Sequence, residues 1–192
     1  RWWVSLCLIN GMSILPRGQS VHQGYHLLES IALAERPGTW HTQPEAGPQN
    51  MDWNPHAKVP RVTSVVAHKE GTKSAIWLLE RLEGGNENRR QLLVEWTRLL
   101  LERPALIESL KLPEILMRRA LDPSPEVAVK ITLCLAKLTD YDKDIGLALS
   151  QRLVGREEVE VRRAMADILT RLFRRLSADA LPLFEKMLAD ED

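Results

Sequence analysis

Apolar residues recur at three- and four-residue spacing from about residue 72 to the end of the chain, interrupted only by Gly and Pro breaks. No run alternates apolar and polar residues for long enough to predict a strand. The periodic segments, each bounded by a cap or a breaker residue, predict helices over Thr72–Glu83, from the Asn86 cap to Pro104, and over Leu112–Leu121, Ser124–Leu138 and Glu157–Leu176. The predicted fold class is therefore all-α.

An internal repeat organises these helices. Glu126-Val127 and Glu160-Val161 lie in similar helical segments 34 residues apart, and Leu112-Pro113 is matched by Leu181-Pro182 after 69 residues, about two such steps. A period in this range, built from one short and one longer helix, is typical of a helical solenoid, because each pair of helices must stack on its neighbours to bury its apolar faces.

The repeat units resemble a known family. Ala105–Leu138 resembles one armadillo repeat, with a short helix, a Leu-Pro step, a second helix and an Asp-Pro-Ser-Pro-Glu-Val turn into a third helix. Gly155–Leu172 is similar to the HEAT version, whose second helix typically opens with Val-Arg, here Val161-Arg162. The chain departs from the armadillo pattern at Leu110-Lys111, where a Gly usually stands, and over Asp140–Val154, which has no Leu-Pro step.

The resemblance covers about residues 72–192. It implies an armadillo/HEAT-like right-handed α-solenoid of about three to four helical units, preceded by an irregular N-terminal region. It also implies that the chain recognises a peptide or a partner domain along an extended groove, with the affinity spread over several repeats.

The N-terminal part divides into two predicted segments. Residues 1–36 form an apolar, helical segment, and the Pro- and Gly-rich residues 37–71 form a loop or linker. Trp2–Leu15 carries no charge but is shorter than a membrane span, so it is a buried helix, a membrane-proximal segment or a targeting remnant. In the membrane-proximal alternative, Trp2 and Trp3 are the anchor.

Composition excludes several classes of function. The chain has 26 basic and 26 acidic residues, and this zero net charge argues against a protein built chiefly to coat nucleic acid. The sequence has no phosphate-binding Gly-rich loop, no dinucleotide fingerprint and no C-x-x-C pair. Two cysteines favour an intracellular protein, cytoplasmic or associated with an organelle membrane.

His22 and His26 have the spacing that places two imidazoles on one helical face for zinc. Gln23 stands where a metalloprotease needs a glutamate, and Gly24 weakens the helix that the geometry requires. We therefore expect solvated or capping histidines, no metal and no cofactor. Since no nucleophile motif is present either, we expect no catalytic residues and no enzyme.

The candidate partner-binding residues are arginines on two predicted helices, namely Arg163, Arg171 and Arg174 on one and Arg118 and Arg119 on the other. They could bind an acidic peptide if the longer helices line a concave face. The alternative is a solvated charged face, because Asp167–Arg171 and Glu158–Arg162 have the spacing of helical ion pairs. We do not expect nucleic acid, since few aromatic residues are available for base stacking.

These observations predict a non-catalytic protein–protein interaction or scaffold module. One alternative is a membrane- or organelle-associated structural subunit of a larger assembly, attached through residues 2–15. A second alternative is a metal-dependent enzyme that uses His22 and His26.

Overall fold

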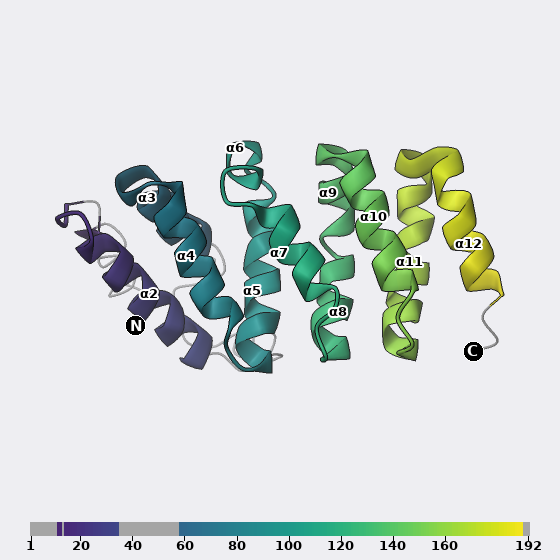
Figure 1. Cartoon of the computed structure of the whole chain (residues 1–192), viewed down its shortest axis with the longest axis horizontal. Coiled ribbons are helices and arrows are strands. Elements are labelled where there is room, and N and C mark those ends of the chain that lie inside the picture. Colours follow the sequence, from purple (N-terminus) through teal and green to yellow (C-terminus); the bar gives the residue numbers. More distant parts are fainter. Residues whose placement is uncertain (1–10, 13, 35–57, 190–192) are drawn as a thin grey trace, which may run out of the picture. The chain divides into compact units, whose positions relative to one another are not determined.

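The computed structural model describes residues 11–12, 14–34 and 58–189, and it has helices and no strands over these residues (Figure 1). The all-α prediction is confirmed for this part of the chain. The chain divides into two compact units, residues 1–99 and 100–192. The boundary lies at the end of a helix and differs from the boundary at 71/72 that the sequence predicted.

The first unit contains four described helices: α2 (Gln19–Ala34), α3 (Lys58–Glu70), α4 (Thr72–Glu83) and α5 (Glu87–Leu100). Helices α2, α3 and α4 pack against one another. Asn86 caps α5 as predicted, because its side-chain oxygen accepts a hydrogen bond of 3.1 Å from the Arg89 backbone amide.

The linker predicted over residues 37–71 is wrong at its C-terminal end, where Lys58–Glu70 forms α3. Pro60 indicates a helix breaker in the sequence, but it lies in the first turn of α3, where a backbone amide has no partner within the helix anyway. Val62 and Val66 are fully buried one turn apart. The burial of this stripe against neighbouring helices outweighs the modest helix propensity of its β-branched residues.

The second unit contains α6 (Pro104–Ile107), α7 (Leu112–Arg119), α8 (Pro125–Thr132), α9 (Leu135–Tyr141), α10 (Lys143–Val154), α11 (Val159–Leu176), the 3₁₀ turn η3 (Ser177–Ala180) and α12 (Leu181–Leu188). Helix α10 packs against α9, α11 and α12, and α11 packs against α8 and α9. In Figure 1, α7, α10 and α12 form the nearer layer of this unit, and α8, α9 and α11 lie behind them.

Ser124 caps α8 as predicted, and Pro125 is its first residue. The single helix expected over Ser124–Leu138, however, is interrupted between α8 and α9. The Thr132 hydroxyl donates a 2.7 Å hydrogen bond to the carbonyl of Val129, which is the acceptor that the Leu133 amide would use in a continuous α-helix. The Leu133 amide instead donates to the Lys130 carbonyl, so the turn tightens and α9 starts anew.

The long-range polar contacts of the second unit have a common spacing. Its side chains make hydrogen bonds or ion pairs across 34 to 36 residues: Arg156 to the carbonyls of Ala120 and Asp122, Arg152 to the carbonyl of Met117, Arg175 to Asp140, Lys137 to Glu102, and Lys143 to Asp179. This spacing equals the period read from the sequence.

Among the described residues, no helix combines the length and the apolar character needed to cross a bilayer. Trp2 and Trp3, and most of the segment Trp2–Leu15 to which they belong, lie outside the described residues. The prediction that Trp2 and Trp3 are a membrane anchor therefore stays a prediction from the sequence.

Candidate partner-binding surface

Three of the candidate arginines predicted from the sequence lie on one outward face of helix α11. Arg163, Arg171 and Arg174 are all exposed. They lie opposite the apolar stripe with which α11 packs into the unit, formed by Val161, Met165, Ile168, Leu169, Leu172 and Leu176. Because this stripe is buried, the helix is fixed in rotation and the three guanidinium groups are presented to solvent. We call these three residues the α11 arginine face.

The intrahelical ion pairs that could neutralise this face do not form. Within the described part of the chain, Arg171 makes no ion pair with Asp167, and Arg163 makes none with Glu160, although the spacings would permit both. Arg174 also has no acidic partner there. The α11 arginine face is therefore available to a carboxylate of another molecule, which an arginine can bind through two parallel hydrogen bonds.

Arg119 of α7 has a different role from the one expected. Its Nη1 atom lies 2.9 Å from Oδ2 of Asp122, and the side chain of Asp122 is fully buried. Oδ1 of Asp122 also accepts a 3.0 Å hydrogen bond from the Ser124 amide. Arg119 thus neutralises a buried carboxylate that shapes the turn between α7 and α8.

Arg118 lies in an open groove of about 850 Å³ between α7 and α10. Acidic side chains outnumber basic ones along this groove, which is lined by Glu108, Pro113, Glu114, Met117, Arg118, Tyr141, Asp142, Asp144, Ile145, Ala148 and Arg152. Its charge is opposite to that of the α11 arginine face. The structure therefore does not join Arg118 with the arginines of α11 into one basic surface.

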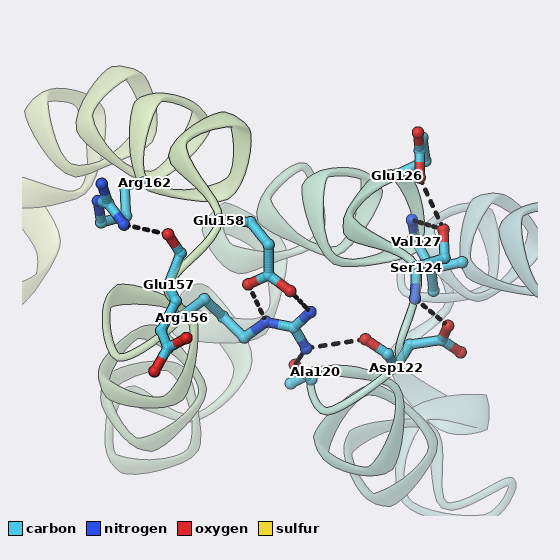
Figure 2. A network of polar contacts seen from close by, with 9 residues as sticks. All are labelled: Ala120, Asp122, Ser124, Glu126, Val127, Arg156, Glu157, Glu158 and Arg162. Carbon is cyan, nitrogen blue, oxygen red and sulfur yellow. Dashed lines mark hydrogen bonds and ion pairs between the residues drawn. The ribbon is translucent and has the colours of Figure 1, made fainter. Parts of the chain in front are cut away.

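Arg156, just before α11, makes the most extensive polar contacts of the second unit (Figure 2). Its guanidinium donates to the carbonyls of Ala120 at 3.0 Å and Asp122 at 2.8 Å, and to both carboxylate oxygens of Glu158 at 2.8 and 2.5 Å. The hydrogen bond with Glu158 raises the pKa of Arg156 and lowers the pKa of Glu158, and in both residues partial burial opposes the shift.

Arg162 lies next to these contacts. It donates to the carbonyl of Glu157, and its positive charge also helps to lower the pKa of Glu158 (Figure 2). Arg156 is not among the residues selected from the sequence. A signal for it was present, since Arg156 lies 34 residues after Asp122, which is the spacing of the repeat that the sequence predicts.

His22 and His26 lie on the exposed side of α2, with their Nε2 atoms 3.2 Å apart. Within the described residues, no group of three or more His, Cys, Asp or Glu side chains is placed to hold a metal ion. Cys134 is buried. The two histidines form a pair of candidate ligands, and no third described His, Cys, Asp or Glu side chain joins them.

The α11 arginine face offers three permanently charged donors on a rigid helix, a chemistry suited to binding carboxylates and not to breaking bonds. Glu160 and Asp167 lie among the arginines, so the surface carries a mixed charge pattern that a partner must match. Comparisons with protein-family models, curated proteins and solved structures find no match to this chain.

Proposed function

We propose that this chain is an armadillo/HEAT-like α-solenoid that serves as a non-catalytic protein-interaction module, and that the α11 arginine face binds an acidic segment of a partner protein. The observation that carries the proposal is the contrast among the arginines of the second unit. Arg119, Arg156 and Arg175 are bound to groups of the chain itself, whereas the α11 arginine face has no acidic partner among the residues that the structure describes.

The solenoid part of the proposal is supported by the agreement between two independent spacings. The sequence repeats after 34 residues, and the side-chain contacts of the second unit link residues 34 to 36 apart. In a stack of repeats, each unit contacts only its neighbours, so contacts at one repeat length are what this architecture requires. The layered packing of α10 on α9, α11 and α12 agrees with such a stack.

A polypeptide fits the α11 arginine face better than a nucleic acid does. A phosphate backbone carries a negative charge at every nucleotide and cannot avoid Asp167, which lies between Arg163 and Arg171, or Glu160, which lies one turn before Arg163. A peptide can place carboxylates opposite Arg163, Arg171 and Arg174 and neutral residues elsewhere. The expected partner is therefore a segment in which acidic and neutral residues alternate.

The test is fluorescence anisotropy with a labelled peptide of alternating glutamate and serine. Replacing the α11 arginine face by glutamine should weaken binding roughly 10- to 150-fold, because three exposed ion pairs contribute about 0.5–1 kcal/mol each. The matched control removes the same charge from exposed residues of the first unit by replacing Lys73, Arg81 and Arg98 with glutamine. This control should change the affinity less than about threefold.

Four results would reject the proposal. An equal loss in both triple variants would show nonspecific attraction by net charge. Absence of binding by the unaltered chain, or no change in the α11 variant, would show that the face is not the site. Tighter binding of an oligothymidine with the same dependence on the α11 arginines would assign the face to nucleic acid.

A further inference from the structure

His22 and His26 form a close pair one helical turn apart on α2. Their Nε2 atoms are 3.2 Å apart, and the rings meet edge to face with centroids 4.4 Å apart. Both residues are exposed. At this distance one imidazole nitrogen donates its hydrogen to the lone pair of the other.

The distance between the two nitrogens matches the requirement of a shared metal ion. Imidazole nitrogens bind divalent transition ions at about 2.0–2.1 Å, so two ligands of one ion lie about 2.9 Å apart at a right angle and about 3.4 Å apart at a tetrahedral angle. The observed 3.2 Å falls between these values. A metal ion could thus replace the shared hydrogen with little movement of either ring.

The helix that carries the pair is held in place. Gly24, which the sequence suggested would weaken this helix, is buried where α2 meets α3. A Cβ atom there would lie 3.2 Å from Val66, 3.3 Å from Met12 and 3.4 Å from Val62. The glycine therefore permits close packing of the two helices, and α2 continues through it. The histidine pair is presented by a packed helix, which lowers the entropy that metal binding must offset.

We infer that His22 and His26 form a binding site for a single divalent transition-metal ion, with water in the remaining coordination positions. Imidazole ligands favour copper, nickel and zinc, whereas magnesium and calcium require oxygen ligands. Gln23 stands where an H-E-x-x-H metalloprotease has its glutamate, so the general base of that mechanism is absent from this position. Copper should bind more tightly than nickel or zinc, following the general order of affinities.

The experiment is isothermal titration of the chain with Cu²⁺, Ni²⁺, Zn²⁺ and Mg²⁺, with electron paramagnetic resonance of the copper form. We expect one site that binds copper most tightly and magnesium not at all, with a spectrum that shows two nitrogen ligands. Replacing either His22 or His26 by Asn should weaken binding at least about tenfold, because the second imidazole acts at high effective concentration. The double variant should be little worse than either single one.

The control is His68→Asn, which removes an exposed histidine from α3 and should leave the titration unchanged. Circular dichroism should be the same for all variants, since the substituted side chains are exposed. Equal losses at His68 and His26, retention of the site in the double variant, or a spectrum with one nitrogen ligand would each reject the site and indicate adventitious binding.

Discussion

Replacing Arg156 by alanine should substantially destabilise the second unit. The guanidinium is the donor for the carbonyls of Ala120 and Asp122, and its side chain is only 12% exposed. Hydrogen bonds to a charged group contribute about 1.5–3 kcal/mol each, and the partly exposed pair with Glu158 adds at most about 1 kcal/mol. Because water reaches the carbonyls after truncation, we expect a net loss of about 2–4 kcal/mol.

The assay is urea unfolding followed by far-ultraviolet circular dichroism. With an m-value of about 2 kcal/mol/M, this loss lowers the midpoint by about 1–2 M. Arg156→Lys keeps the charge but not the planar donor geometry, and it should lie between the wild type and Arg156→Ala. Glu158→Gln should cost less than about 1 kcal/mol, since it leaves both carbonyl contacts intact.

The matched control is Arg163→Ala, which removes an exposed arginine and should change the free energy of unfolding by less than about 0.5 kcal/mol. If Arg156→Ala and Arg163→Ala shift the midpoint equally, the contacts across 34 to 36 residues do not hold the unit together. If Glu158→Gln reproduces the whole effect of Arg156→Ala, the stabilisation comes from the local ion pair and not from the hydrogen bonds to the carbonyls of Ala120 and Asp122.

Three further predictions concern the same unit. The hydrogen bond from Arg156 lowers the pKa of Glu158 in the folded state. The contribution of Glu158 to the free energy of unfolding is therefore present above the ordinary glutamate pKa of about 4.3 and is lost as the pH falls through the lower folded value. Urea titrations at several pH values should show that the difference in stability between wild type and Glu158→Gln shrinks below about pH 4. Gly146→Ala should destabilise by about 1–3 kcal/mol, because the new Cβ would lie 2.3 Å from Oγ1 of Thr139, whereas Gly84→Ala, with only one atom at 4.0 Å, should have little effect on the thermal midpoint. Ser124→Ala should cost about 1 kcal/mol through loss of the α8 cap, and an unchanged urea midpoint would show that its 3.4 Å contact with the Val127 amide is too long to matter.

Signals that lie within a few residues predicted the helices well. The apolar period and its flanking breakers give Thr72–Glu83 as the structure has it, and the Leu-Pro step gives the start of α12 at Leu181. The interruption after Thr132 could not be predicted in this way. It depends on the Thr132 hydroxyl donating its hydrogen bond to a carbonyl of its own helix and not to water. Helix α3 was missed because its stability comes from burial against neighbouring helices, which a breaker such as Pro60 conceals in the sequence.

The candidate site required information of longer range. Sequence spacing within α11 suggested ion pairs such as Asp167–Arg171, but that pair is absent in the described part of the chain, since spacing shows only that two side chains can meet. The repeat period is a better guide in this unit. Arg175 lies 35 residues after Asp140 and is paired with it, and Lys137 lies 35 residues after Glu102 and is paired with it.

The same period explains why the α11 arginine face stays unpaired. Positions 34 to 36 residues before Arg163 and Arg171 are 127–129 and 135–137, and neither range contains an acidic residue. The corresponding range before Arg174 contains only Asp140, whose oxygens lie 2.5 and 3.3 Å from the nitrogens of Arg175. Within the described residues, the positions 34 to 36 earlier in the chain therefore offer these three arginines no unbound carboxylate. This supports the proposal that the α11 arginine face binds a carboxylate of another molecule, whereas an arginine such as Arg175 is paired within the chain.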